Sequence, residues 1–395
     1  MAGTIVQGNV STEEVLSDER VIDMDDRIRK LKPDESQFTT MTDKTGSKEA
    51  VREKVNWLEE EDFPRLVTGD AQTNVSTTLN VNAGQGKIVA ANDVLRNMRS
   101  GEAIRVVSVA TDALTIARGI GTIPAAATNA GDVYLVVADA QPQGSDFPTP
   151  RYLARVLGFN YTEITRTTWS FTGTQTAIEL YGGREPGKEA VRKAREHKRK
   201  WEAIGFFGAR SFVAAAPPEN EPRGTAGGAN EFITTYRTDV NGALTPSAFD
   251  NFIMPIMANG EPGSKVLFAS PVVVQCMSSW VRVGMGAQWQ PTPENVFGVK
   301  VDAFISGAYG YRIPVVVKKE WSEFPYANKG YGGYAFLLDM SLIEQRPLRD
   351  RNTKLITDQQ PKGKDVYSAE YMREATYQFA QERAHGLLFG TTPPP

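Results

Sequence analysis

Residues 151–210 read RYLARVLGFNYTEITRTTWSFTGTQTAIELYGGREPGKEAVRKAREHKRKWEAIGFFGAR and join a Thr-rich run to a long basic segment. From 161 to 176, Thr, Tyr, Ile, Trp and Phe alternate loosely, which is typical of a half-buried strand. After Gly182 and Gly183 the apolar residues recur at spacings of three and four, the period of a helix. This apolar stripe consists of Ala190, Ala194, His197, Trp201 and Ile204. The sequence therefore predicts an extended arm that leads into one long helix.

The rest of the predicted helix surface is charged. Glu189 and Lys193 are four residues apart, as are Glu196 and Lys200, so a solvated face with ion pairs along the helix is one interpretation. The other interpretation is a basic face that contacts a neighbouring subunit or a polyanion. The candidate residues for this face are Arg184, Lys188, Arg192, Arg195, Lys198 and Arg199.

Composition restricts the possible functions. The chain of 395 residues has a formal net charge of −3, which gives no overall attraction to nucleic acid, so contact with DNA requires a local basic face. Cys276 is the single cysteine, which excludes an intrachain disulfide and suits a reducing cytoplasm. Its apolar surroundings predict a buried, inert thiol. His197 and His385 are the only histidines, so there is no zinc ligand set, and we expect both to be structural.

Motifs for catalysis or cofactor binding are missing. The sequence has no phosphate-binding loop, no G-x-S-x-G and no H-E-x-x-H, and Gly84-x-Gly86 and Gly119-x-Gly121 do not complete a dinucleotide motif. We therefore predict no cofactor, no metal and no enzymatic activity. The sequence contains no secretory signal and no long apolar run, so we predict a soluble intracellular product without membrane contact.

One acidic run stands out in the N-terminal part of the chain. Consecutive residues point to different sides, so the run is a poor acid/base pair and a poor metal cage. We expect it to complement a basic surface on a neighbouring subunit. Its members are Glu59, Glu60, Glu61 and Asp62.

The remaining pattern predicts a mixed α and β protein. A short helix capped by Ser17 ends at Pro33, and 64–147 contain short β-rich runs with turn residues between them, as in a small barrel or sandwich. Helices begin at Pro246 and Pro271, and the Pro/Gly-rich stretch 216–230 and the polar stretch 348–365 are predicted loops. The run 367–390 fits a helix or a strand equally well. Predicted strands are 77–82, 87–91, 103–109, 114–119, 132–139, 265–270, 296–302, 312–321 and 333–339.

Three further motifs make the combination more specific. The first motif is the run RIRKLKPDESQFTTMTDKTGSKEAVREKVNWLEEEDF at 27–63. It is followed by the Tyr181-Gly182-Gly183 entry to the helix and then by the terminal Glu382-Arg383-Ala384-His385-Gly386. Together they resemble the major capsid proteins of tailed bacteriophages with the Hong Kong 97 fold. The resemblance implies an α+β fold with an N-terminal arm, an extended loop carrying a small β-barrel insertion, a long spine helix, a peripheral domain and an axial domain. It also implies that 367–390 form a strand.

The resemblance further implies domain boundaries along the chain. These are 1–63 for the N-terminal arm, 64–147 for the barrel-like insertion, 148–183 for the return strand of the extended loop, 184–240 for the spine helix and peripheral domain, 241–335 for the axial domain, and 336–395 for the rest of the axial domain with peripheral strands.

The implied function is a major capsid protein that self-assembles into the icosahedral head around the double-stranded DNA genome. Its expected partners are further copies in hexamers and pentamers, portal, scaffolding or decoration proteins, and packaged DNA through non-specific contacts. The expected location is the virion, after synthesis in the bacterial host cytoplasm. One alternative is an encapsulin compartment that holds cargo enzymes. Another is a soluble enzyme with a pocket lined by 284–310.

Overall fold

The computed structural model describes residues 36–178, 185–215, 221–282, 289–296, 299–305 and 312–394. The predicted helix before Pro33, residue Arg184 of the predicted basic face, and part of the hypothetical enzyme pocket at 284–310 lie outside the described residues. The chain forms two compact units. The main unit comprises Met1–Trp57 and Gly158–Pro395, and the inserted unit comprises Leu58–Leu157. The chain passes between them through β1 (Lys54–Glu59) and β8 (Val156–Tyr161), which pair with each other.

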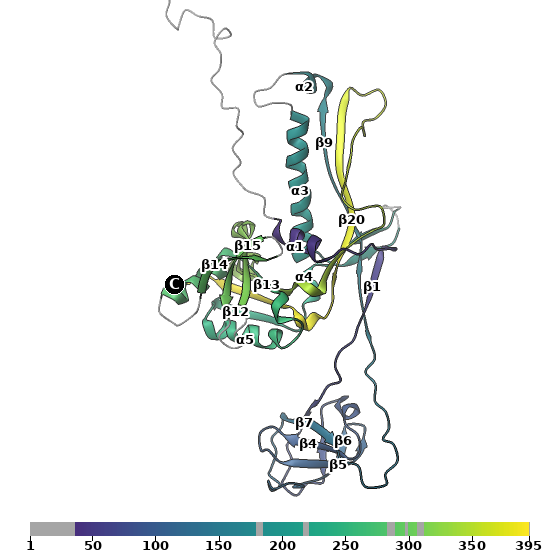
Figure 1. Ribbon diagram of the computed structural model, residues 1–395, viewed down its shortest axis with the longest axis vertical. Helices are drawn as coiled ribbons and strands as arrows, with labels where there is room; N and C mark the ends of the chain where they lie inside the picture. Colours follow the sequence, from purple (N-terminus) through teal and green to yellow (C-terminus); the bar gives the residue numbers. More distant parts are fainter. Residues whose placement is uncertain are drawn as a thin grey trace, which may run out of the picture. The chain divides into compact units, whose positions relative to one another are not determined.

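A mixed seven-stranded sheet forms the centre of the main unit (Figure 1). Successive side chains of a strand point to opposite faces, and every residue of the central strand β13 (Lys265–Ala269) is buried, so both faces of the sheet are covered there. Within β13, Leu267 and Ala269 pack with helices α5 (Pro246–Met257) and α6 (Pro271–Arg282), whereas Val266 and Phe268 pack with α1 (Gln37–Thr45) and α3 (Glu185–Phe207). The strand order is β12 (Arg237–Ala243), β21 (Gly386–Thr392), β17 (Ala335–Asp339), β13 (Lys265–Ala269), β16 (Arg312–Val317), β15 (Val299–Ile305) and β14 (Trp289–Val296).

Two long antiparallel strands lie beside α3. Strand β9 (Glu163–Thr172) pairs with β20 (Val366–Phe379) from Glu163 opposite Ala375 to Thr172 opposite Val366. The other edge of β20 pairs with β18 (Ile343–Pro347) and β19 (Lys354–Ile356). The strand that the resemblance implied for 367–390 is therefore confirmed only as far as Phe379. A 3₁₀ turn (Glu382–Ala384) follows, and the rest of the run forms β21 of the central sheet.

The inserted unit is an antiparallel sheet of six strands. Strands β2 and β3, at the two ends of its order, are joined by hydrogen bonds from the Asp70 N–H to the Asn80 carbonyl at 3.0 Å and from the Asn82 N–H to the Thr68 carbonyl at 2.9 Å. The sheet thus closes into a small barrel around an apolar core that includes Val67. The order is β2 (Leu66–Gly69), β7 (Asp132–Asp139), β4 (Asp93–Asn97), β5 (Ala103–Ala110), β6 (Ala113–Ala117) and β3 (Thr78–Asn80).

The strand predicted at 87–91 is wrong, because a single 3₁₀ turn (Gln85–Ile88) occupies its first part. Gly84 has a φ of +81°, and the Asp112 carboxylate accepts hydrogen bonds from the Gly84 and Gly86 N–H groups. A Cβ on Gly86 would lie 1.8 Å from the Thr111 carbonyl oxygen. The close backbone contact and the carboxylate therefore fix a turn where the apolar run alone predicts a strand.

Other predicted segments differ at their ends or in part. The segment predicted as one strand at 296–302 contains the end of β14 at Val296 and the start of β15 at Val299, and the strand predicted at 312–321 stops at Val317, before a 3₁₀ turn (Lys319–Glu323). The strand predicted to reach residue 176 stops at Thr172, whose hydroxyl accepts a hydrogen bond from the Gln175 N–H and caps the short helix α2 (Gly173–Ala177). The predicted loop 216–230 contains β11 (Arg223–Thr225), which pairs with β10 (Ser211–Val213), and the predicted loop 348–365 contains β19. These two strands are only three residues long, too short for an apolar period to predict.

Candidate functional site

The long helix α3 lies beside the β9–β20 pair (Figure 1), and its apolar stripe faces the protein interior, as predicted. His197 and Trp201 are buried in this contact. The Thr167 hydroxyl lies 3.1 Å from His197 Nδ1, and the Trp201 and Tyr377 rings are 6.1 Å apart. Helical periodicity therefore decides which side of α3 faces the protein.

The two histidines are buried and uncharged at neutral pH. Burial, with the positive charge of Arg373 nearby, lowers the pKa of His197 to about 4. Burial also lowers the pKa of His385 to about 4, and His385 Nδ1 accepts a hydrogen bond from the Asp339 N–H at 3.0 Å. Both side chains fill structural positions, as the sequence predicts.

The predicted basic residues mostly share the opposite side of α3. At about 100° per residue, Lys188, Arg192, Arg195 and Arg199 fall within an arc of about 60°, roughly opposite the buried stripe. Arg184 would continue this arc but lies outside the described residues. Lys198 lies off the arc, on the side where α1 packs, and its charge acts on Asp43 of that helix.

Contacts within the chain divide the basic residues further. Arg199 pairs with Glu320 at 2.8 Å, and Arg192 pairs with Glu189 at 3.3 Å while its side chain stays 77% exposed. Across the described part of the chain, Lys188 and Arg195 form no hydrogen bond or ion pair. We call Lys188, Arg192 and Arg195 the basic stripe, because within the described residues the one ion pair of these three is the exposed contact of Arg192 with Glu189.

One of the two predicted ion pairs along the helix is confirmed. Lys200 Nζ lies 3.5 Å from a Glu196 carboxylate oxygen. The pair predicted between Glu189 and Lys193 is wrong, because Glu189 pairs with Arg192 and Lys193 pairs with Glu196 at 2.7 Å, each three residues away. Both spacings place side chains on adjacent turns, so sequence alone does not choose between them.

The predicted acidic run lies where β1 ends, in the inserted unit. Glu59 is half-buried as the last residue of β1, and Glu60, Glu61 and Asp62 are exposed. Glu60 lies 3.3 Å from Arg155, and both of these side chains are more than half exposed, so the pair adds little stability. Nowhere in the described residues do three or more His, Cys, Asp or Glu side chains form a group that could hold a metal ion.

Glu202 of α3 has a structural role that no pattern in the sequence predicted. Its buried carboxylate accepts hydrogen bonds from the Phe38 N–H at 2.9 Å and from the Thr39 N–H and hydroxyl at 2.7 Å each. Lys318 Nζ donates to it at 2.6 Å. Because Ser36 makes no side-chain cap, Glu202 takes the place of the N-cap of α1 from a distant part of the chain. No local pattern indicates this role.

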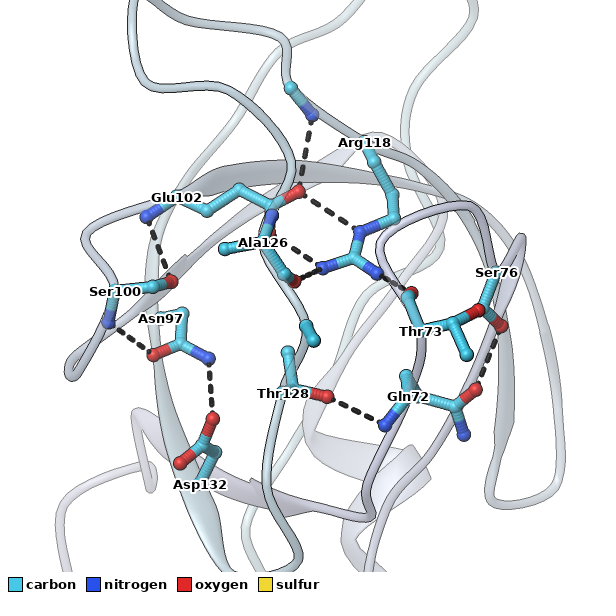
Figure 2. Close-up of polar contacts among 12 residues, drawn as sticks. Gln72, Thr73, Ser76, Asn97, Ser100, Glu102, Arg118, Ala126, Thr128 and Asp132 are labelled. Atoms are coloured by element: carbon cyan, nitrogen blue, oxygen red, sulfur yellow. Dashed lines mark hydrogen bonds and ion pairs between the residues drawn. The ribbon is translucent and has the colours of Figure 1, made fainter.

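The inserted unit holds a comparable buried pair, Arg118 and Glu102 (Figure 2). The guanidinium donates to both carboxylate oxygens, at 3.0 and 2.6 Å, and also to the Thr73 and Ala126 carbonyls. Burial opposes the charge of Glu102, but these hydrogen bonds and those from the Gly119 and Ala126 N–H groups keep its pKa below the ordinary value. The pair joins loops at one part of the barrel and leaves no free group for chemistry.

The single cysteine and the helices offer no further functional site. Burial raises the pKa of Cys276, which keeps the thiol protonated, as predicted. Of the helices in the described residues, none is both long and apolar enough to span a membrane.

Comparison with known proteins identifies the family. The sequence model of the SU10 major capsid protein family matches residues 4–392. The major capsid protein of Pseudomonas phage PaMx41 is 29% identical over 185 residues, which are 46% of this chain and 43% of that protein. The chain thus spans less than half the length of this relative. Both matches are major capsid proteins, which favours the phage capsid over the encapsulin alternative.

A solved structure supports the fold, and a second one is similar in part. A chain of Microbacterium phage Oxtober96 superposes with a TM-score of 0.50 at 10% identity and covers 98% of this chain and all of that one. The capsid of Myoviridae phage XM1 gives a TM-score of 0.46 at 10% identity, over 95% of this chain and 98% of that one. The fold is that of the Hong Kong 97-type capsid proteins, as the resemblance implied, and the chain belongs to the SU10 major capsid protein family.

Proposed function

We propose that this chain assembles in many copies into the icosahedral shell that encloses the double-stranded DNA genome of a tailed phage. The observation that carries the proposal is the exposure of large apolar side chains near the two ends of the inserted unit. Phe147 is 101% exposed and Tyr152 is 87% exposed. Further exposed members of this set, which we call the apolar arm, are Leu58, Phe63, Leu153, Val156 and Leu157.

Such a concentration of apolar surface is costly for an isolated chain. Burial of apolar area stabilises by roughly 25 cal/mol per Å², so these side chains stabilise only when a partner covers them. For a chain of a capsid protein family, the partner is another copy of the same chain. Repeated contacts between identical copies close into a symmetric shell, so one surface serves every copy.

The two charged surfaces have separate roles in this proposal. The basic stripe on α3 faces packaged DNA or an acidic surface of a neighbouring copy, and the acidic run at 59–62 complements a basic surface of a neighbour. Contact with DNA through such a stripe would be independent of base sequence and would weaken as salt rises. The proposal also includes the arrangement of copies in hexamers and pentamers and contacts with portal, scaffolding or decoration proteins. It further includes synthesis in the host cytoplasm before the virion forms.

The direct test is electron microscopy of the purified full chain together with size-exclusion chromatography. We expect icosahedral particles that elute in the void volume. Nuclease-protected DNA of genome length inside particles from infected cells would support the phage head. A chain that stays monomeric at high concentration would contradict the proposal.

A variant tests the observation that carries it. Phe147→Ser combined with Tyr152→Ser should leave subunits folded but raise the concentration needed for assembly by at least about tenfold, the equivalent of roughly 1.4 kcal/mol. Val75→Ser is the control, because Val75 is 79% exposed in the same unit but lies outside the apolar arm. Normal assembly of the double variant would remove the apolar arm from the proposal.

A further inference from the structure

A groove of about 710 Å³ opens in the main unit beside the start of β9. Its apolar part includes Ile164 and the rings of Tyr161 and Phe212, which are stacked with their centroids 5.2 Å apart. A second hollow of about 520 Å³ shares Glu53 and Glu374 with it. The groove therefore combines an aromatic surface with carboxylates at its sides.

The carboxylates give the groove an excess of negative charge. Its lining contains Glu53, Glu163, Glu221 and Glu374 but one arginine, Arg223. Glu374 is already paired with Arg351 at 2.5 Å. In the part of the chain that the structure describes, the other three carboxylates form no ion pair. A cationic occupant would compensate them.

The environment of Glu163 points the same way. Burial raises its pKa, and the one hydrogen bond that opposes this effect comes from the Ala226 N–H at 3.0 Å. A positive charge placed in the groove would stabilise the ionised form of this carboxyl group. Glu163 therefore gains from a partner that the isolated chain does not supply.

Aromatic rings next to the groove already hold cations. Lys54 Nζ lies 4.2 Å from the centre of the Phe159 ring, and the guanidinium carbon of Arg210 lies 4.3 Å from it. Tyr161 already has Lys54 Nζ 6.0 Å from its ring centre, whereas Phe212, which also lines the groove, offers the same kind of surface to an incoming lysine or arginine. The groove thus suits long cationic side chains with an apolar stem.

The chain itself carries a matching surface in the basic stripe, Lys188, Arg192 and Arg195. These residues lie three and four apart on one side of a rigid helix, so they present their charges as a single row. Within one copy, none of the three pairs with a residue of the groove. A second copy can bring the two surfaces together.

We infer that the groove of one copy receives the basic stripe of the next copy in the shell. The contact joins two different surfaces, so it is head-to-tail, and its repetition around an axis closes into a ring. The inference rests on the proposed function, because it requires that copies of this chain assemble. It adds a specific contact and the residues on each side of it.

Charge reversal tests the contact. The groove variant carries Glu53→Arg and Glu221→Arg, both at exposed positions, and the stripe variant carries Arg192→Glu and Arg195→Glu. Each should raise the subunit concentration for half-maximal assembly by about tenfold or more, and a chain with all four changes should recover most of the loss. Asp146→Arg and Lys354→Glu serve as controls, because they change charge at exposed positions outside both surfaces.

The outcomes separate the two levels of the proposal. A wild-type chain that forms no particles would overturn both the function and the contact. If the wild-type chain forms particles and both variants assemble normally, the contact alone is overturned. The contact is also overturned if both variants are impaired and the chain with all four changes does not recover. If the groove variant assembles poorly but the stripe variant assembles normally, the groove binds a different basic segment, such as 27–32. This result would also overturn the inference.

Discussion

Each compact unit contains a buried carboxylate paired with a cation, but the two pairs hold together very different lengths of chain. In the inserted unit, Glu102 and Arg118 are 16 residues apart, and Arg118 reaches Thr73 across 45 residues. In the main unit, Glu202 and Lys318 are 116 residues apart, and Glu202 reaches Phe38 across 164 residues. Contacts in the inserted unit span shorter stretches of chain, such as the pairing of Leu66 with Leu135, whereas the main unit depends on contacts between more distant segments.

The difference has a physical consequence for stability. The entropy lost on closing a loop rises with its length, so long-range contacts must overcome a larger cost before they form. Glu202 also satisfies two backbone N–H groups at the start of α1 and the charge of Lys318 at once. Its loss should therefore affect three segments of the main unit together.

The largest expected effect comes from Glu202→Gln. The variant leaves the buried Lys318 charge without its partner, and we expect the free energy of unfolding of the main unit to fall by about 3–5 kcal/mol. All six tryptophans lie in the main unit, so denaturant unfolding followed by tryptophan fluorescence reports on this unit alone. Glu196→Gln, at a half-exposed position on the same helix, is the matched control and should change stability by less than about 0.5 kcal/mol. Equal effects of the two changes would show that the long-range contact adds nothing.

Arg118→Met should have a smaller and confined effect. Glu102 loses its cation but keeps hydrogen bonds from the Gly119 and Ala126 N–H groups, so we expect the inserted unit to lose about 2–3 kcal/mol. Hydrogen–deuterium exchange of the full chain should become faster in peptides from 58–157 and stay unchanged in the main unit. Faster exchange in both units would contradict the view that the contacts of Arg118 act within the inserted unit alone.

The same contrast explains what the sequence could predict. Period and propensity act over a few residues, so they predicted the stripe of α3 and most strands of the inserted unit. They also predicted α5, whose Thr245 hydroxyl caps it by accepting a hydrogen bond from the Ala248 N–H. They failed at 87–91, where the Asp112 carboxylate binds the backbone of Gly84 and Gly86 and fixes a turn.

The interaction surfaces were only partly predictable. Helical geometry placed Lys188, Arg192 and Arg195 on one side of α3, but it could not show that Arg199 is used by Glu320 or that Lys198 lies toward α1. The role of Glu202 and the groove beside β9 arise from segments that are brought together only by the tertiary fold. Neither has a signal in local sequence.

Acid should also distinguish the two units, because both histidines lie in the main unit. The folded-state pKa of His385 is about 4, below its ordinary value of 6.5, so its contribution to stability is complete above pH 6.5 and is lost as pH falls toward 4. Between pH 7 and pH 5, protonation of this histidine in the unfolded state should lower the free energy of unfolding of the main unit by on the order of 1–2 kcal/mol. In the inserted unit, hydrogen bonds from Arg99 hold the pKa of Asp132 far below this range, so this group should contribute no change.

The measurement is the difference in pH dependence between wild type and His385→Gln. Asp43 and Glu163 also lie in the main unit, and burial raises their pKa values, so protonation of these groups acts in the opposite direction. Comparison with His385→Gln cancels their contribution. The same pH dependence in wild type and variant would show that His385 is not buried in its neutral form.

The smallest expected effect is that of Arg192→Gln, on the same helix as Glu202. The Arg192 side chain is 77% exposed and lies 3.3 Å from Glu189, so the free energy of unfolding should change by less than about 0.5 kcal/mol in the fluorescence assay. A loss above about 1 kcal/mol would mean that the main unit itself uses this charge. A negligible loss of stability combined with impaired assembly would instead assign the charge to contacts between copies. The two ends of α3 would then have different roles. The C-terminal end, with Glu202, joins distant segments of one chain, and the N-terminal end, with Arg192, is available to a partner.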